Sequence, residues 1–449
     1  MNINVDPALR ESAIEHLRAL LRLNTMSPPG NEKLAADHLA AILREAGFDE
    51  VHVLESAPNR ATLVARLRAD APAGRPIMLM GHTDVVTVEP ERWDRDPFGG
   101  ELVDGYIWGR GALDMKGQVA AELAVMLALK EREVPLDRDV IFVAFADEEA
   151  GGAFGADWMW KHHRDLIDAE FAINEGGGSP MEIEGHRFYG CQVAEKGSTH
   201  LRMTVTGTPG HASVPLDDTA MSRLGEALAR LHAWQSPTVF TPTVRAMLTT
   251  IANAVCGELS GTVRDLLDRG DVAWEELAKL PFNEDELLTL RATTRNTAVP
   301  TMIHGGQRIN VIPGEIVVDI DGRVLPGQDP EAFRAEVQAA VVDLASVEIV
   351  TPDGGTAADA ESAFFDAIGE TITALDPEAA VIPTMSSGGT DAPLIPGVKV
   401  YGFFPMLPTE RLQIYDPLVH GHNERIHVDD LAFGTQFIYD LVVRFAGRA

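Results

Sequence analysis

The chain has 449 residues, of which 45% are hydrophobic and 23% are charged, so it is long enough for two or three globular domains. Its 68 Asp and Glu residues outnumber its 37 Lys and Arg residues, which gives a formal net charge of −31. So acidic a surface repels phosphate groups. This argues against general nucleic-acid binding and against docking on anionic membranes.

Cysteine usage and hydropathy indicate a cytoplasmic, soluble protein. Cys191 and Cys256 lie in unrelated contexts without CxxC spacing, so neither a disulfide framework nor a thiolate zinc site is expected. Residues 1–17 contain no apolar core of a signal peptide. No apolar run approaches the roughly 20 residues that span a bilayer.

The first half of the chain alternates between helix and strand patterns. Apolar spacing predicts helices over Pro7–Leu23, Asn31–Ala46 and about Gly117–Lys130. The predicted strands are Val51–Leu54, Ala61–Leu67, Pro76–Met80, Val140–Ala146 and Phe171–Asn174. This alternation indicates a layered α/β domain.

A different pattern begins after Lys196-Gly197. Alternating strands over Leu201–Thr206 and Glu315–Ile320, with a helix over Thr219–Trp234, predict a smaller sheet with one open face. The intervening stretch Thr241–Arg295 contains helix-like acidic segments and is placed only loosely.

The α/β pattern resumes at Asp329 and ends in a helix over Asp429–Phe445. We therefore predict an α/β catalytic domain in two parts, residues 1–198 and 326–449, interrupted by a smaller α+β module over residues 199–325.

Acids and histidines follow the ends of several predicted strands. They are His82 and Asp84, Asp114 just ahead of a helix, Glu148 and Glu149, and Glu175. Taken alone, each cluster also suits an ordinary loop, turn or solvated surface. Ligands of open α/β sheets gather at the carboxyl ends of the strands, however, so the clusters together favour one shared pocket.

Carboxylates that converge in one pocket repel each other unless a cation neutralises them. Carboxylate and imidazole ligands suit Zn²⁺, with Mn²⁺ or Co²⁺ as substitutes. One histidine is too few for a typical zinc site, and His420 or His422 near the C-terminus offers a second. The residues alone therefore predict a metal site and leave these two histidines as alternatives.

Several motifs resemble the co-catalytic zinc peptidases and deacylases, a family that includes aminoacylase-1, carboxypeptidase G, carboxypeptidase S and succinyl-diaminopimelate desuccinylase. The matching segments cover essentially the whole chain: Gly81–Val86, Trp93–Phe98, Gly109–Gly117, Ala146–Gly152, Asn174–Gly176, Gly210–Ser213, Asn310–Pro313 and His420-x-x-Asn423-Glu424. The stretch from Arg295 to Gly306 looks most like the carboxypeptidase S branch. The resemblance implies a zinc-exopeptidase-like α/β fold whose inserted module is a lid and dimerisation domain.

The resemblance also implies roles for the metal-site residues. His82 and Glu175 would bind one Zn²⁺ and Glu149 and His420 a second, with Asp114 bridging both. Asp84 would hold the His82 ring by its other nitrogen. Glu148 would be the general base that takes a proton from the attacking water and returns it to the leaving nitrogen. In relatives the peptide between Asp114 and Met115 is cis.

Further implied roles fall mainly in the inserted module. His211 would reach the active site of a partner subunit, which makes a homodimer the expected assembly. Arg323 would hold a substrate carboxylate, because its guanidinium matches a carboxylate bidentately. Asn310 and the turn at Gly389 and Thr390 would line the same end of the pocket.

We therefore expect a metallopeptidase or amidohydrolase of the carboxypeptidase, dipeptidase or aminoacylase type. Its substrate would be a dipeptide, a C-terminal peptide or an N-acyl amino acid. The alternatives are an N-acyl-diamino-acid desuccinylase or deacetylase of amino-acid biosynthesis, and a non-catalytic metal-bound binding protein, against which the presence of Glu148 counts. A dinucleotide oxidoreductase is discarded because Gly109-Arg110-Gly111 lacks the required third glycine.

Overall fold

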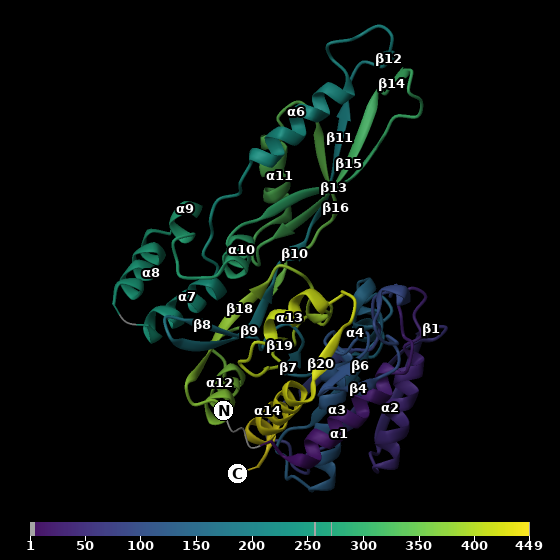
Figure 1. Ribbon diagram of the computed structural model, residues 1–449, viewed down its shortest axis with the longest axis vertical. Coiled ribbons are helices and arrows are strands. Elements are labelled where there is room, and N and C mark those ends of the chain that lie inside the picture. Colours follow the sequence, from purple (N-terminus) through teal and green to yellow (C-terminus); the bar gives the residue numbers. More distant parts are fainter. Residues whose placement is uncertain (1–4, 256, 271, 449) are drawn as a thin grey trace. The chain divides into compact units, whose positions relative to one another are not determined.

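The computed structural model describes residues 5–255, 257–270 and 272–448, so Cys256 lies outside the described residues. The chain forms two compact units (Figure 1). Unit 1 comprises Met1–Val193, Ala358–Pro383 and Thr390–Ala449, and unit 2 comprises Ala194–Ala357 and Thr384–Gly389. The predicted domain boundaries stay a prediction.

Unit 1 is built on a mixed sheet in the order β1-β2-β6-β3-β7-β19-β9. These strands are β1 (Glu50–Ala57), β2 (Arg60–Leu67), β6 (Val140–Phe145), β3 (Ile77–His82), β7 (Phe171–Asn174), β19 (Lys399–Gly402) and β9 (His186–Glu195). β3 is parallel to both β6 and β7, and β19 is parallel to β7. The carboxyl ends of these four central strands therefore meet at one edge of the sheet.

Helices cover both faces of the central strands, as their almost wholly apolar sequences require. α1 (Pro7–Leu21), α3 (Lys116–Glu131) and α14 (Val428–Ala446) pack against one another, and α3 packs on β3 and β6. On the other face, Met78, Val143 and Phe145 pack with Met159 and Ile167 of two short helices. This arrangement confirms the layered α/β fold class.

The remaining elements of unit 1 are short or peripheral. A three-stranded sheet in the order β20-β5-β4 joins the C-terminal motif region to the segment around Trp108. The bounds are α2 (Lys33–Glu45), α4 (Ala156–His162), α5 (Arg164–Ile167), α12 (Ala363–Leu375), α13 (Leu412–Tyr415), β4 (Glu101–Val103), β5 (Tyr106–Trp108), β8 (Pro180–Ile183), β18 (Ala379–Ser386) and β20 (Arg425–His427), with 3-10 turns η1 (Pro90–Arg92), η2 (Glu148–Ala150), η3 (Ala392–Leu394) and η4 (Asp416–Leu418).

Unit 2 contains a five-stranded sheet in the order β10-β15-β11-β16, with β13 paired to β15. Its strands are β10 (Gly197–Ser198), β11 (His200–Thr206), β13 (Thr297–Gly305), β15 (Glu315–Val324) and β16 (Ser346–Thr351). β11 and β15 alternate buried and less buried residues, so one face forms a core with α6 (Ala220–Ala233) and α11 (Pro330–Val341). The other face is more open, as the alternation in the sequence predicts.

The rest of unit 2 consists of short strand pairs and a helical segment. Its elements are α7 (Pro242–Ala254), α8 (Glu258–Arg269), α9 (Trp274–Leu277), α10 (Glu284–Thr293), β12 (Gly210–His211), β14 (Val311–Ile312) and β17 (Thr356–Ala357). Residues 326–357, which the sequence analysis placed with the catalytic domain, lie in unit 2. The reason is that Phe333 and Val337 of α11 pack into its core and β16 pairs with β11.

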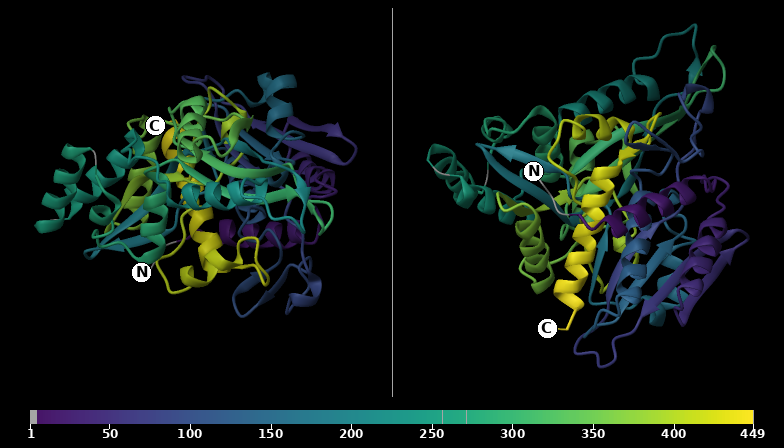
Figure 2. Two further views of the ribbon diagram at one scale, coloured as in Figure 1. Left: turned by 90° about the horizontal axis from the view of Figure 1, so that it is seen from above. Right: turned by 60° about the horizontal axis from the view of Figure 1, so that its bottom comes forward.

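Figure 2 shows α14 beside α1 in unit 1, and the two helices pack against each other. Among the described residues, no helix combines the length and the apolar character needed to cross a bilayer.

Candidate metal centre

The predicted metal ligands of unit 1 converge at the carboxyl edge of its central strands. His82 is the last residue of β3, Glu149 lies in η2 directly after β6, and Glu175 directly follows β7. Asp114 precedes α3, and His420 lies in the loop before β20. Five residues that span more than three hundred positions of the chain are thus brought into two overlapping groups.

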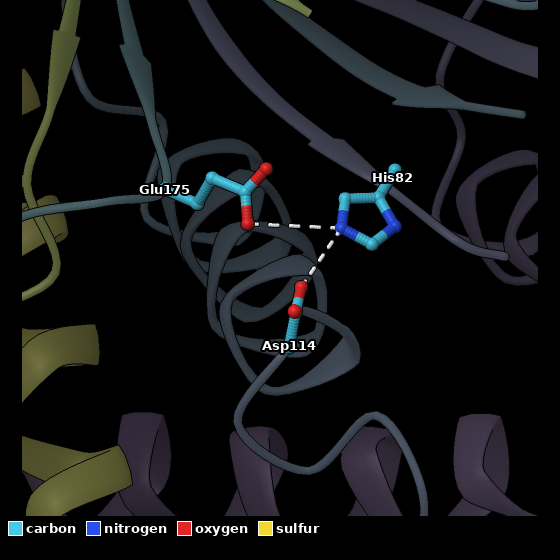
Figure 3. A group of neighbouring side chains, drawn as sticks. All are labelled: His82, Asp114 and Glu175. Atoms are coloured by element: carbon cyan, nitrogen blue, oxygen red, sulfur yellow. Dashed lines mark hydrogen bonds and ion pairs between the residues drawn. The ribbon is translucent and has the colours of Figure 1, made fainter. Parts of the chain in front are cut away.

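The first group consists of His82, Asp114 and Glu175 (Figure 3), whose ligand atoms all lie within 4.8 Å of one another. His82 Nε2 is 3.0 Å from Asp114 Oδ1 and 3.7 Å from Glu175 Oε2. The His82 side chain is only 1% exposed. This group therefore forms a buried half of the site.

The second group consists of Asp114, Glu149 and His420. His420 Nε2 lies 3.1 Å from Asp114 Oδ2 and 3.1 Å from Glu149 Oε2. The two oxygens of Asp114 thus face different histidines, Oδ1 toward His82 and Oδ2 toward His420. The His420 side chain is 54% exposed, so this half of the site is open to solvent.

The described geometry separates the two candidate histidines near the C-terminus. His420 belongs to a group of metal-ligand character, whereas His422 does not, and His422 Nδ1 is buried without a hydrogen-bond partner among the described residues. His420 has a φ of 58°, in the left-handed region that is uncommon for residues other than glycine.

Glu148 lies beside these groups and belongs to neither of them. Its Oε2 is 3.9 Å from His82 Nε2, and its side chain is 15% exposed. The backbone N–H groups of Glu148 and Glu149 each donate to the buried carboxylate of Asp84 at 3.1 Å. Asp84 thereby fixes the turn that carries both glutamates.

Asp84 also contacts the Nδ1 atom of His82. The closest partner of His82 Nδ1 is the backbone carbonyl oxygen of Asp84 at 3.0 Å, and the Asp84 carboxylate is 3.5 Å away. The carboxylate is thus mainly committed to the turn after β6. The peptide between Asp114 and Met115 is cis, as expected from the resemblance.

Without a cation, the electrostatics of the cluster disfavour the ionised forms of its three glutamates. Burial, together with Glu175, Asp391 and Glu149, raises the pKa of Glu148 to about 10. Burial and Asp114 raise the pKa of Glu149 to about 7, and burial raises the pKa of Glu175. Positive charge beside these glutamates would lower their pKa values and favour their ionised forms.

The pKa values of His82 and His420 are also raised, which for a histidine favours the charged form. Although burial opposes its charged form, nearby Glu175 and Asp114 raise the pKa of His82 well above its usual value. A hydrogen bond with Asp114 raises the pKa of His420. A divalent ion would supply positive charge beside these carboxylates, and the imidazole and carboxylate donors fit a metal such as Zn²⁺.

A buried ion pair joins the loops that carry Asp114 and His420. Arg110 Nη1 donates to Glu424 Oε2 at 2.6 Å, and both side chains are at most 2% exposed. The Glu424 carboxylate also accepts the backbone N–H groups of Gly111, Leu113 and Asp114. Arg110 Nη2 donates to the carbonyl oxygens of His420 and Gly421.

A second buried network supports the turn with the glutamate pair. Arg60 donates to both oxygens of Glu32 and to Asp147 Oδ1, and Asp147 Oδ2 accepts the backbone N–H of Phe154. Asp147 has a φ of 71° and directly precedes Glu148. The network therefore fixes the direction in which the chain leaves β6.

None of these supporting residues was assigned a role from the sequence. Arg110, Asp147 and Glu424 lay inside matching motifs, which was the available signal for them. Glu32 and Arg60 lay outside every motif, so only their burial and contacts reveal them.

Of the predicted pocket residues, Thr390 belongs to unit 1 and Gly389 to unit 2. The Thr390 hydroxyl accepts the side-chain N–H of Asn174, which directly precedes Glu175. Thr390 therefore lies at the carboxyl end of β7, beside the buried half of the site.

His211, Asn310 and Arg323 all belong to unit 2. β12 pairs His211 with Val311, and the backbone N–H of Ala212 donates to the Asn310 carbonyl, so His211 and Asn310 lie close together. Arg323 donates through Nε and Nη2 to the two oxygens of Asp321, and through Nη1 to the Ser198 hydroxyl. A substrate carboxylate on Arg323 would have to share the guanidinium with Asp321.

Comparison with known proteins identifies the family of the chain. The family model described as peptidase family M20/M25/M40 matches residues 78–444. Human N-fatty-acyl-amino acid synthase/hydrolase PM20D1 is 28% identical over 84% of this chain and 75% of its own length. Aminoacylase-1 from Sus scrofa is 28% identical over 91% of this chain and 89% of its own.

The carboxypeptidase branch is represented as well. A probable carboxypeptidase S-like protein of Dictyostelium discoideum is 28% identical over 82% of this chain and 71% of its own length. Among solved structures, an M20 family metallo-carboxypeptidase, Sso-CP2 from Sulfolobus solfataricus, has a TM-score of 0.67 with 19% sequence identity, covering 96% of this chain and 98% of its own. The chain therefore belongs to peptidase family M20/M25/M40 and is a hydrolase of the metallopeptidase and amidohydrolase class.

Proposed function

We propose that the protein is a di-zinc hydrolase that cleaves an amide bond next to a free carboxylate, in an N-acyl amino acid, a dipeptide or a C-terminal peptide. The observation that carries this proposal is the position of Asp114, whose two oxygens face His82 at 3.0 Å and His420 at 3.1 Å. A carboxylate between two histidine-containing groups is suited to bridge two cations.

In this proposal His82, Asp114 and Glu175 hold one Zn²⁺, and Asp114, Glu149 and His420 hold the other. When bound, the two ions would neutralise the converging carboxylates, polarise the amide carbonyl and acidify the attacking water. Mn²⁺ or Co²⁺ would suit the same donors.

Glu148 is the general base of the proposed reaction. It is free of both ligand groups, lies 3.9 Å from His82, and its backbone is fixed by Asp84. In its ionised form it takes a proton from the attacking water while the water oxygen bonds to the amide carbon. It then returns that proton to the amide nitrogen as the carbon–nitrogen bond breaks, which leaves a carboxylic acid and an amine.

On the substrate side, Arg323 would hold the free carboxylate, with Asn310, Gly389 and Thr390 lining the same end of the pocket. The names of the relatives support both an acyl-amino-acid substrate and a carboxypeptidase substrate. We further propose a homodimer in which His211 serves the site of the partner subunit. Light scattering of the purified protein tests this assembly.

The test of function is amine release from N-acyl amino acids and dipeptides, each beside its carboxyl-amidated analogue. The protein is stripped of metal and reloaded with Zn²⁺, and Glu148→Gln is compared with Glu45→Gln, which changes an exposed acid on α2. We expect zinc-dependent turnover that requires the free carboxylate and is lost only in Glu148→Gln. Turnover that survives in Glu148→Gln would overturn the assigned base. Failure of every substrate with two zinc ions bound would support the non-catalytic binding protein.

A further inference from the structure

Unit 2 contains a cleft of about 520 Å³ that none of the proposed catalytic roles uses. It lies between the end of α6, the segment that follows it, α10 and the start of β13. Much of its lining is apolar, including Leu228, Trp234, Leu288 and Val299. Leu288 and Val299 are 58% and 56% exposed.

Two arginines, Arg291 and Arg295, also line this cleft. Arg295 is 6% exposed and donates only to neutral oxygens, from Nη1 to Gln235 at 2.7 Å and from Nη2 to Thr238 at 3.3 Å. Its Nε is buried and has no hydrogen-bond partner within the described part of the chain. Among the described residues, neither arginine forms an ion pair with a carboxylate.

This pair of cations is unusual in a chain with a net charge of −31, where 68 acids are available to 37 basic residues. A buried cation without a counterion is costly. Burial and the positive charge of Arg291 lower the pKa of Arg295, and Glu275 acts in the opposite direction. The ring of Trp274 lies 5.5 Å from the Arg291 guanidinium carbon and 5.8 Å from that of Arg295.

We propose that this cleft is a binding site for a small monocarboxylate with an apolar chain. The carboxylate would accept hydrogen bonds from Arg295 and Arg291, because a guanidinium matches a carboxylate in shape and charge. The apolar chain would lie on Leu228, Leu288 and Val299. The cleft volume falls within the range of sites for small ligands, about 300–1,000 Å³.

The site lies wholly within unit 2 and does not involve the metal-ligand groups of unit 1. Binding there is therefore expected to be independent of metal and of Glu148. The inference goes beyond the proposed function and does not depend on it.

The test is isothermal titration calorimetry with octanoate, below the concentration at which it aggregates, and with methyl octanoate as the uncharged comparison. Arg295→Gln should weaken octanoate binding by about tenfold or more, because it removes a charged hydrogen-bond donor. The control is Arg264→Gln, an exposed arginine of α8 that donates to Ser260 and Asn253 outside the cleft.

A second variant provides an independent test in case Arg295→Gln does not fold. Leu288→Glu places a carboxylate on an exposed lining position and should repel octanoate, whereas Leu288→Gln should not. Saturable binding that is equal with and without zinc and weakened in both charge variants supports the site. Unchanged affinity in Leu288→Glu, equal binding of methyl octanoate, or loss of binding on zinc removal would overturn it.

Discussion

The two halves of the candidate metal centre differ in how the fold supports them. His82 lies at the end of a fully buried strand and is 1% exposed, whereas His420 lies in a loop and is 54% exposed. His82 is positioned by the parallel sheet itself. His420 is positioned through its backbone, by Arg110 and the Arg110–Glu424 ion pair. A site of this kind can combine a pre-formed half with a half that depends on remote polar contacts.

The largest effect is expected at Asp114, the one residue common to both groups. Asp114→Ala should remove both metals and lower turnover by about 10³-fold or more, since each bound metal contributes several kcal/mol to transition-state stabilisation. Metal content by mass spectrometry and zinc-dependent turnover measure this. Retention of two metals would show that Asp114 does not bridge them.

Replacing each histidine in turn tests whether the two halves bind metal with different affinities. His420→Ala should leave one tightly bound metal in the buried group. His82→Ala should leave one weakly bound metal, because the remaining group is solvent-exposed on the His420 side. Competition with a chelator compares the two affinities, and equal retention in both variants would contradict the proposed asymmetry.

Glu424→Gln tests the ion pair that supports the open half. Removing one partner of a buried pair is expected to cost about 3–5 kcal/mol of unfolding free energy. Loss of support for the ligand loops should also weaken metal binding by about 10–100-fold. Urea unfolding and metal titration measure the two effects.

Asp376→Asn is the matched control, because Asp376 is buried in unit 1 and accepts from Arg187 at 2.9 Å but belongs to neither metal-ligand group. It should destabilise the fold without weakening metal binding. Equal loss of metal affinity in both variants would mean that Glu424 acts only through global stability.

The smallest effect is expected at Glu122, a fully buried acid of α3 whose one hydrogen-bond partner among the described residues is Gln118. Burial raises its pKa well above 4.5. Because the folded-state pKa is the higher one, stability falls as pH rises above the unfolded value.

Glu122→Gln should therefore stabilise the protein, and more at pH 8 than at pH 5. The gain at pH 8 should reach at least about 1.4 kcal/mol, the equivalent of one pKa unit. Urea unfolding at both pH values measures it, with Glu131→Gln, an exposed acid at the end of α3, as the control. A gain that does not change with pH would refute the raised pKa.

The regular elements near the site could be predicted from periodicity. β7 has the predicted bounds, and the ends of β3 and β6 differ from the predicted ends by at most two residues. The agreement is close because continuous apolar runs specify buried strands. The residues from 241 to 295 could be placed only loosely. α10 buries only Leu290 and Thr293, so its apolar spacing is too weak to define its face.

The residues of the two candidate ligand groups could be picked out because they follow strands or lie in motifs. The residues that support these groups could not be predicted, because a local sequence pattern carries no information about contacts between distant loops. Arg110 and Glu424 are 314 positions apart, and the partners Glu32 and Arg60 lie outside all motifs. Likewise, the commitment of the Asp84 carboxylate to the glutamate turn depends on the path of the chain after β6.

The most direct test of the account is a Co²⁺ titration of the metal-stripped protein, followed by visible absorption and by calorimetry. The account predicts two equivalents per chain, the first binding more tightly to the buried group with His82. In His420→Ala only the first should remain. One equivalent in the wild-type chain, or two equivalents unaffected by His420→Ala, would contradict a centre built from two groups that share Asp114.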